Sequence, residues 1–399
     1  MEGGHSCLPI NAEGNRGFKL KRILVLTVLA GMGHIRAAEA ICEGIRSVSQ
    51  ESVVWLKDPL EEEPKKQRFI NDFYVFMARH MPHLWGYFYN SRLLSGAYSP
   101  MRWYITRRYA SLIAKNIKEW NPDIIVSTHP FLAAAVGVLK KRKGLNIPLI
   151  SVATDFHVHL FGINKQVDTF IVPCEEVAEY LNRQGVNSEK IVSCGIPISL
   201  KFSVPLRIEE AKEKLGFDRD KPLVLLLSGG FGIGPVLDLL KAFRGIEGKF
   251  QLAIIIGRDE KLRKRAKEIA QTLNCPIKVF SFVDNMEEFV SAADMVITKP
   301  GGMSVSETLA KRVPLCLMQA IKGQEEWNVR ILVKAGAAVY SKDVRDIPSV
   351  VIGLLNDEAK CSCMRESAGR LGKPNCSENI ARLVINIGVT DNVSGIHKS

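Results

Sequence analysis

Residues 294–328 contain glycines and polar side chains that could bind a phosphorylated ligand. A short apolar run, long enough for a buried strand, is followed by Lys-Pro-Gly-Gly at 299–302. Proline fixes the backbone there, and the paired glycines allow a tight turn and a close backbone approach. A helical pattern follows, then a second apolar strand and Gly-Gln-Glu at 323–325. A helix N-terminus after such a turn presents N–H groups and the positive end of the helix dipole, which suit a phosphate.

Glu307, inside this stretch, has two interpretations. Ser304 and Glu307 have the spacing of a capping box, in which a serine and a glutamate satisfy each other's backbone donors at a helix start. For these two residues alone, the capping box is the simpler interpretation. The other interpretation, a contact between the carboxylate and a bound ligand, needs support from the residues around it.

A second glycine turn, near the start of the chain, ends in a histidine. Residues 23–29 form an apolar run typical of a buried parallel strand, and Ala-Gly-Met-Gly at 30–33 leads to His34 and a helical pattern. A dinucleotide-binding fingerprint would have a small residue at Arg36 and an acidic residue about 20 positions on, so a nicotinamide enzyme is a minor alternative. An isolated histidine would most simply cap the helix or donate to a backbone carbonyl. In an active site the same imidazole could act as a general base.

Asp155 follows another apolar run, at 149–153, within the sequence Thr-Asp-Phe. A similar loop, Thr-His-Pro at 128–130, also follows an apolar run. Both loops come at the carboxyl ends of predicted parallel strands, which is the edge where open α/β sheets bind their ligands. Asp155 could orient His34 or a sugar hydroxyl, or it could be an ordinary turn or capping aspartate.

Alternating apolar runs and helical patterns predict an α/β protein made of two similar halves. The second half opens as the first does, with an apolar strand, a glycine loop at 228–234 and a helix that Pro235 begins. The charged segment 201–222 contains prolines and is expected to link the halves. Beyond residue 338 the pattern is helical to about residue 387. Strands of the second half are expected at 223–227, 252–256, 278–282, 295–298 and 314–318.

The composition favours a folded protein with an anionic partner. The 399-residue chain has 46% hydrophobic residues, which suffices for a large core and excludes a largely disordered protein. Its formal net charge of +12 favours a nucleotide, a nucleic acid or an anionic membrane surface as the partner.

Neither a metal site nor a membrane-spanning segment is expected. The nine cysteines are scattered without a CxxC pair, which argues against a zinc ribbon and favours reduced thiols in a cytosolic protein. His157 and His159 have no evident third metal ligand. Residues 1–17 lack the apolar core of a secretory signal, and no apolar run reaches the roughly 18 residues that a transmembrane helix needs.

Residues 69–109 mix aromatic and basic side chains. Of the chain's 30 aromatic residues, 12 lie here, and between residues 65 and 118 ten Lys or Arg residues accompany a single acidic one. Such a mixture suits a bilayer interface, where aromatic rings sit at headgroup depth and cations meet anionic lipid. The aromatics could equally be core, and similar mixtures bind single-stranded nucleic acid. The residues singled out for membrane or acceptor contact are Trp85, Arg102, Trp103, Arg107 and Arg108.

The stretch at 294–328 resembles the donor-site motif of the UDP-sugar glycosyltransferases that glycosylate diacylglycerol. The parts that carry the resemblance are Thr-Lys-Pro-Gly-Gly at 298–302, Ser-Glu at 306–307 and Gly-Gln-Glu at 323–325. The broader group includes the bacterial N-acetylglucosaminyltransferase that completes the peptidoglycan lipid precursor. Thr-Asp-Phe at 154–156 also matches, and the family's first glycine loop ends in the same histidine, although Met32 stands where glycine is usual.

The resemblance covers roughly residues 22–338 and implies the GT-B architecture, in which two Rossmann-like domains face each other across a cleft. The last helix could pack back on the N-terminal domain. The expected division is a flexible N-terminus at 1–18, an acceptor- and membrane-side domain at 19–200, a linker at 201–222 and a UDP-sugar-binding domain at 223–399.

The activity implied is an inverting transfer of a hexose from UDP-hexose to the hydroxyl of diacylglycerol, by a peripheral protein at the cytoplasmic face of a membrane. Glucose is slightly favoured over galactose, because the Pro-Gly-Gly form resembles bacterial members that transfer glucose. His34 would take the hydroxyl proton, helped by Asp155, while amides and cations would stabilise the departing UDP, so no metal or other cofactor is expected. The residues implied in UDP-sugar binding are Gly230, Gly232, Arg258, Val283, Lys299, Gly301, Gly302, Ser304, Glu307, Gln324 and Glu325.

Within that set, the resemblance places the glycine turn against the UDP phosphates, Glu307 on the ribose hydroxyls and Gln324 with Glu325 on the sugar. One alternative is a related transferase that acts on a polyprenyl-linked or other lipid. Another is a catalytically silent protein that binds a nucleotide sugar or a nucleic acid. The presence of Glu307, Gln324 and His34 argues against a silent protein, and the clustering of aromatics in one half argues against a nucleic-acid track along the chain.

Overall fold

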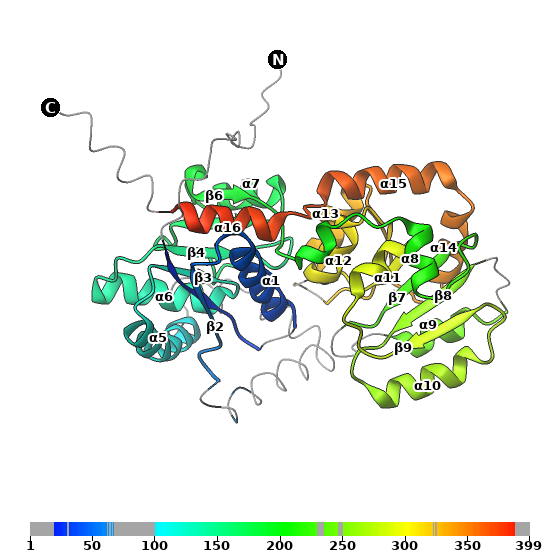
Figure 1. Ribbon diagram of the computed structural model, residues 1–399, viewed down its shortest axis with the longest axis horizontal. Helices are drawn as coiled ribbons and strands as arrows, with labels where there is room; N and C mark the ends of the chain where they lie inside the picture. The colour runs from blue at the N-terminus through cyan, green and yellow to red at the C-terminus, as the bar shows by residue number, and fades with distance from the viewer. Residues whose placement is uncertain are drawn as a thin grey trace, which may run out of the picture.

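The computed structural model describes residues 20–29, 32–61, 63, 65, 67, 100–229, 235–245, 250–321, 323 and 325–387. These residues form two α/β halves that lie side by side, each built on a six-stranded parallel sheet (Figure 1). The predicted fold class, with two Rossmann-like halves, is confirmed.

The N-terminal half alternates strands and helices along the chain. Its elements are β1 (Arg22–Leu26), α1 (Met32–Val48), β2 (Val53–Lys57), α5 (Pro100–Trp120), β3 (Ile124–Ser127), α6 (Pro130–Lys143), β4 (Leu149–Val152), β5 (Thr169–Val172), α7 (Glu175–Arg183), the 3₁₀ helix η1 (Ser188–Lys190) and β6 (Ile191–Ser193).

The C-terminal half repeats this alternation, and a final helix follows it. Its elements are the 3₁₀ helix η2 (Leu200–Ser203), α8 (Ile208–Lys214), β7 (Leu223–Leu227), α9 (Val236–Ala242), β8 (Gln251–Ile255), α10 (Glu260–Ala270), β9 (Ile277–Phe280), α11 (Met286–Ala292), β10 (Met295–Thr298), α12 (Gly302–Ala310), β11 (Leu315–Met318), α13 (Glu326–Lys334), β12 (Ala338–Ser341), α14 (Ile347–Leu355), α15 (Glu358–Leu371) and α16 (Cys376–Asn386).

Both sheets are covered on their two faces, so their central strands are buried throughout and mostly apolar. The N-terminal sheet has the order β2-β1-β3-β4-β5-β6, with α1 and α16 on one face and α5, α6 and α7 on the other. The C-terminal sheet has the order β12-β11-β10-β7-β8-β9, with α9, α10 and α14 on one face and α11, α12 and α13 on the other. Of the second set, α12 and α13 contact the N-terminal half.

Two parts of the chain differ from the expected secondary structure. Residues 338–341, expected in a helix, form the edge strand β12, because they pair in parallel with β11. The segment 201–222, expected as a linker, carries α8, which packs against α11 of the C-terminal half.

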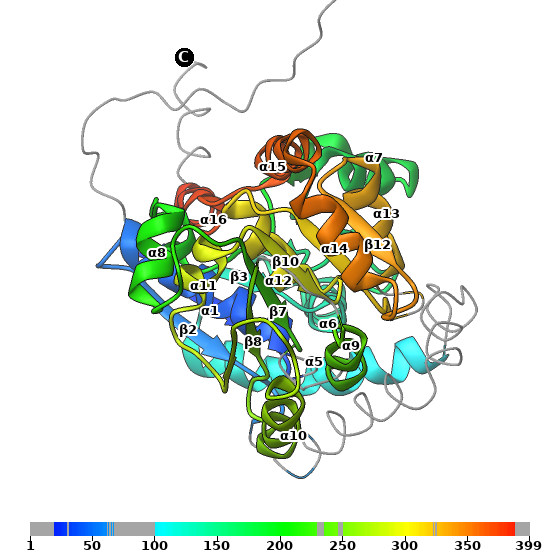
Figure 2. The ribbon, with the colours of Figure 1, turned by 90° about the vertical axis from the view of Figure 1, so that its right-hand side faces the viewer.

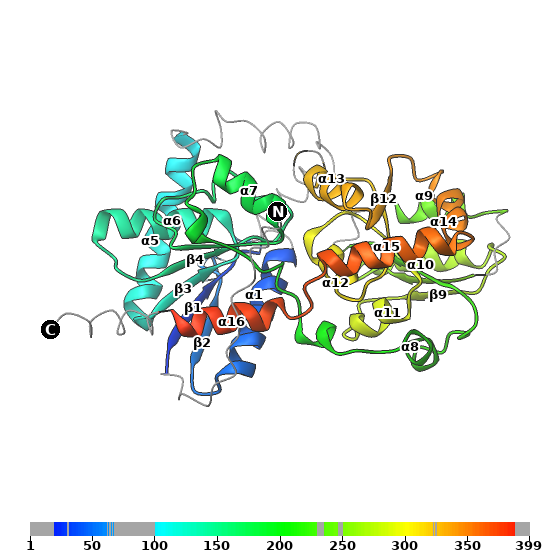
Figure 3. The same cartoon turned by 90° about the horizontal axis from the view of Figure 1, so that it is seen from above.

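The last helix of the described chain returns to the N-terminal half, where α16 packs along α1 (Figure 3). The two helices approach closely at Gly44, where an added Cβ would lie 2.4 Å from the carbonyl oxygen of Ser377. A larger residue at position 44 would therefore push the helices apart.

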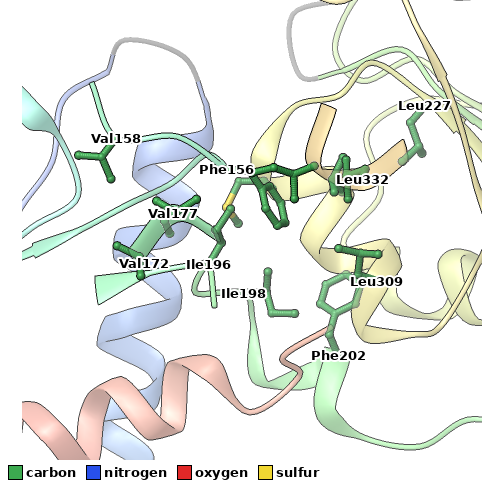
Figure 4. Packing of buried hydrophobic residues seen from close by; sticks show 14 of the residues in the cluster. Phe156, Val158, Val172, Val177, Ile196, Ile198, Phe202, Leu227, Leu309 and Leu332 are labelled. Carbon is green, nitrogen blue, oxygen red and sulfur yellow. The ribbon is translucent and has the colours of Figure 1, made fainter. Parts of the chain in front are cut away.

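A hydrophobic cluster continues from one half into the other (Figure 4). Phe156 and Ile196 contribute to it from the N-terminal half, and Leu309 and Leu332 from the C-terminal half. Because this core is shared, the two halves are held in a defined relative position, which brings their facing loops together.

Candidate active site

His34 lies in the first turn of α1, against the ends of two neighbouring strands. Its Nδ1 donates to the carbonyl oxygen of Thr128, 2.7 Å away, and the Thr154 hydroxyl lies 3.0 Å from the same nitrogen. Thr128 and Thr154 follow β3 and β4. Strand β3 pairs in parallel with β1, and β4 pairs in parallel with β3, so the carboxyl ends of the three strands align. Because Nδ1 carries the proton given to Thr128, the lone pair of the ring is on Nε2.

The protein keeps this imidazole neutral. Burial lowers the pKa of His34 to about 4, and the hydrogen bond to Thr128 opposes part of that shift. His129 lies edge-on to it, with the ring centroids 4.6 Å apart, and burial also holds the pKa of His129 well below its usual value. At neutral pH, His34 can therefore accept a proton on Nε2.

The side chain of Asp155, in the N-terminal half, contacts the start of α12 in the C-terminal half. Its Oδ1 accepts hydrogen bonds from Gly302 N, at 3.2 Å, and from Asn328 Nδ2, at 3.0 Å. The bonds that orient His34 come from Thr128 and Thr154, so the geometry favours Asp155 as a contact between the halves.

Gly302 allows this contact to be close. A Cβ at Gly302 would lie 2.0 Å from the carbonyl oxygen of Thr154 and 2.9 Å from Asp155 Oδ1. The glycine turn therefore brings the N-terminus of α12 directly onto the loop beside His34. The predicted contact of this turn with UDP phosphates stays a prediction.

The capping-box interpretation of Ser304 and Glu307 is wrong. Helix α12 begins at Gly302 with Gly301 as its N-cap, so Ser304 is already inside the helix. The carbonyl of Ser304 accepts a hydrogen bond from the Thr308 hydroxyl. Glu307 lies further along the helix and is 5% exposed. A capping contact with Ser304 therefore does not explain why this carboxylate is buried.

The carboxylate of Glu307 faces the N-terminal half. Its Oε1 lies 3.8 Å from Arg36 Nη1, on α1. Burial raises the pKa of Glu307 to about 7, while Arg36 lowers it and the nearby Glu287 raises it further. A carboxylate held near its titration point by burial, beside a cation from the opposite half, is typical of a ligand-binding site.

An exposed aromatic ring, Phe282, lies beside this pair of charges. The guanidinium carbons of Arg36 and Arg258 are 5.8 and 5.1 Å from the centre of the Phe282 ring, which is within cation–π distance. Val283 packs partly buried against the core shared by the two halves. Arg258, Val283 and Glu307 thus lie in one neighbourhood, as expected for parts of one binding site.

The turn at 323–325 lies against the glycine turn at 299–302. Glu325 precedes α13 and is buried, and its Oε2 accepts a hydrogen bond from Ile321 N at 2.8 Å. Burial raises the pKa of this carboxyl and the cation of Lys299 lowers it. A Cβ on Gly301 would lie 3.8 Å from Glu325 Oε1, so both turns converge. Three of the predicted donor-site residues, Gly230, Gly232 and Gln324, lie outside the described residues.

The predicted membrane segment is described from α5 onward, and its aromatic residues divide between surface and core. Trp103 and Tyr104 are 55% and 68% exposed, whereas Tyr109 is buried. Arg107 lies 4.5 Å from the centre of the Trp103 ring, and Arg108 pairs with Glu63. Trp85 and the side chain of Arg102 lie outside the described residues.

The described part of the chain contains no helix long and apolar enough to cross a membrane. Within the same residues, no three His, Cys, Asp or Glu side chains form a group that could hold a metal ion. Residues 218–220 read Asp-Arg-Asp, a pair of carboxylates close enough in sequence to share a metal ion. They form a local turn, in which Asp218 accepts from the backbone of Asp220 and pairs with Lys221.

Several residues of the site were not predicted from the sequence. Thr128 and Thr154 carry a usable signal, since each follows a predicted strand in a loop at the ligand-binding edge. Arg36 lies two residues beyond His34, at the position where a dinucleotide-binding fingerprint would have a small residue. Phe282 and Asn328 have no local signal, because their contacts come from distant parts of the chain.

Two family models match the chain, one in each half. Residues 34–198 match the monogalactosyldiacylglycerol (MGDG) synthase model, and residues 235–366 match the glycosyltransferase family 28 C-terminal domain. A similar protein is the processive diacylglycerol beta-glucosyltransferase of Bacillus cytotoxicus, 28% identical over 375 residues that cover 92% of this chain and 94% of the relative.

Solved structures share the fold over almost the whole chain. MurG of Acinetobacter baumannii has a TM-score of 0.58 at 17% identity, covering 92% of this chain and 100% of that one. The S. aureus MnaA-UDP co-structure has a TM-score of 0.63 at 15% identity, covering 94% and 98%. Each half of the chain therefore resembles a glycosyltransferase family, the MGDG synthases in residues 34–198 and glycosyltransferase family 28 in residues 235–366, and the fold is that of the GT-B glycosyltransferases.

Proposed function

We propose that this enzyme transfers a hexose from UDP-hexose to the hydroxyl of diacylglycerol at a membrane surface, with inversion at the anomeric carbon. The relatives named as diacylglycerol glucosyltransferases support this acceptor, and glucose as the donor sugar. The observation that carries the proposal is the position of His34 beside the start of α12, as a neutral imidazole whose lone pair is on Nε2.

In this mechanism Nε2 of His34 accepts the proton of the lipid hydroxyl as its oxygen attacks the anomeric carbon. Attack opposite the leaving group inverts that carbon. Asp155 supports the arrangement by holding Gly302 against the loop beside His34. The departing UDP is stabilised by the remaining first-turn amides of α12 and by the positive charges of Lys299, Arg36 and Arg258.

The acceptor side is proposed to be the surface of α5. Trp103 and Tyr104 are exposed there, with the cation of Arg107 beside them. In Figures 1 and 2, α5 runs along the lower edge of the N-terminal half and α7 along its upper edge. Rings and cations on one edge suit a peripheral contact with the anionic cytoplasmic leaflet.

The test is release of UDP from UDP-glucose with liposomes that contain or lack diacylglycerol. We expect release to depend on diacylglycerol and the lipid product to carry glucose, with UDP-galactose a poorer donor. Equal release with and without diacylglycerol would contradict this acceptor. Transfer only to a polyprenyl-linked lipid, supplied in a parallel sample, would favour the related transferase instead.

A further inference from the structure

We infer that Asn328 is a positioning residue, whose side chain fixes the donor turn of the C-terminal half against the loop that orients His34. The inference rests on the proposed role of His34 as the general base. Asn328 was not among the residues expected in the site, and it is fully buried near the start of α13.

The carboxamide of Asn328 joins three groups. Its Oδ1 accepts from Phe156 N at 2.8 Å, and its Nδ2 donates to Pro300 O at 2.6 Å and to Asp155 Oδ1 at 3.0 Å. The orientation of the amide is fixed by its partners, because the Phe156 amide can only donate and the Pro300 carbonyl can only accept.

These partners belong to the two sides of the proposed reaction. Pro300 is in the donor turn, next to Gly301. Asp155 and Phe156 directly follow Thr154, whose hydroxyl lies 3.0 Å from Nδ1 of His34. One buried side chain therefore connects the backbone that carries the donor site with the loop that holds the base.

Only a group with both donors and an acceptor can make these contacts. An apolar residue would leave the Phe156 amide and the Pro300 carbonyl buried without this partner. An aspartate has the same shape but would place a carboxylate beside Asp155 and the Pro300 carbonyl. Both changes should loosen the loop relative to the donor turn, where Gly302 already leaves no spare room.

A second contact keeps the halves together when this one is removed. Trp327, the neighbour of Asn328, stacks on His157 with a centroid distance of 4.9 Å and an interplanar angle of 3°. The shared hydrophobic core is also untouched by a change at Asn328. We therefore expect a misaligned site in a folded protein.

The test compares Asn328→Ala and Asn328→Asp with a matched control, Gln251→Ala. Gln251 is also a buried carboxamide, which accepts from Asp218 N at 2.8 Å and donates to the carbonyls of Asp218 at 2.7 Å and Lys221 at 3.3 Å. These bonds stay within the C-terminal half, at the amino end of β8, so the control loses equivalent contacts away from the cleft.

At saturating UDP-glucose, we expect both Asn328 variants to lose roughly 30- to 100-fold in kcat, since a misplacement of about 1 Å can cost 10²-fold. Their KM for UDP-glucose should stay within about threefold of the wild type, because all of the proposed donor contacts except Arg36 lie in the C-terminal half. Gln251→Ala should keep its kcat. Hydrogen exchange at 153–157 should accelerate in Asn328→Ala, because the Phe156 amide loses its acceptor, and stay unchanged in the control.

Turnover of Asn328→Ala equal to that of Gln251→Ala would overturn the inference, whatever the exchange rates. If the wild type transfers no sugar at all, the proposed function fails separately. The inference is then decided by exchange, and unchanged exchange at 153–157 in Asn328→Ala would overturn it.

Discussion

At the level of single residues, burial moves the pKa of His34 and that of Glu307 in opposite directions. The pKa of His34 falls from 6.5 to about 4, so its contribution to stability is present above pH 6.5 and lost as the pH falls toward 4. The pKa of Glu307 rises from 4.5 to about 7, so its contribution is present below pH 4.5 and lost as the pH rises through 7. Near neutral pH, His34 is a free base and Glu307 is partly ionised.

This titration of Glu307 predicts that the affinity for UDP-glucose depends on pH. If Glu307 accepts a hydrogen bond from a ribose hydroxyl, its carboxylate form should bind that hydroxyl more strongly than its acid form, by about 1 kcal/mol. The affinity for UDP-glucose should therefore rise roughly fivefold from pH 5.5 to 8.5. UDP-glucose suits the measurement better than UDP, because a terminal phosphate itself titrates near pH 6. Calorimetry at several pH values is the measurement.

Two variants test whether Glu307 causes this pH dependence. In Glu307→Gln the pH dependence should disappear and affinity should stay near the low-pH value. Glu358→Gln, which removes an exposed carboxylate on α15, should behave as the wild type. A pH dependence that persists in Glu307→Gln would separate Glu307 from the nucleotide.

At the level of elements, the helix starts show what the sequence could and could not predict. The glycine turns and the strands before them were predicted, because apolar runs, proline and paired glycines are local signals. The capping box at Ser304 was wrong, because the glycines at 301–302 let α12 begin earlier than the serine indicates. Strand β12 was assigned to a helix, because four residues carry too little periodicity to reveal pairing with β11.

The proposed position of UDP at the start of α12 leads to a prediction about metal dependence. If amides and the cations of Lys299, Arg36 and Arg258 meet the departing UDP, activity should stay within about twofold in excess EDTA. The measurement is UDP release before and after chelation. Loss of activity that magnesium or manganese restores would show a metal requirement, and Asp218→Asn would then be the first variant to examine.

Helix α5 predicts a membrane contact with two components. Exposed Trp103 and Tyr104 supply a term that salt does not screen, and Arg107 supplies one that it does. Each basic residue near an anionic surface contributes about 1 kcal/mol, so Arg107→Glu should weaken liposome binding roughly ten- to thirtyfold at low salt. Replacing both rings by alanine should reduce the binding that remains at high salt.

The control for α5 is Arg183→Glu, which reverses an exposed charge on α7 at the opposite edge of the same half (Figure 1). Co-sedimentation with liposomes of increasing anionic lipid content gives the measurement, and circular dichroism shows that each variant is folded. If the α5 variants and the control bind equally, α5 is not the membrane contact.

At the level of the whole molecule, the site is formed where two halves meet, and this limited what the sequence could predict. His34, Glu307 and Asp155 follow recognisable local patterns, so the sequence singles them out as candidates. The partners that define their geometry lie far away in the chain, as Arg36 does for Glu307 and Asn328 does for Asp155. No local periodicity encodes such pairs, because they depend on how the shared core places one half against the other.

The most direct test of the account measures transfer of glucose from UDP-glucose to diacylglycerol by the wild type and by His34→Ala, with UDP-glucose affinity measured on both. The wild type should yield the inverted glycolipid, with kcat/KM flat near neutral pH and falling as the pH approaches 4. His34→Ala should bind UDP-glucose normally and turn over roughly 10²–10⁴-fold more slowly, as expected for loss of a general base. Near-normal turnover by the folded variant would contradict the account.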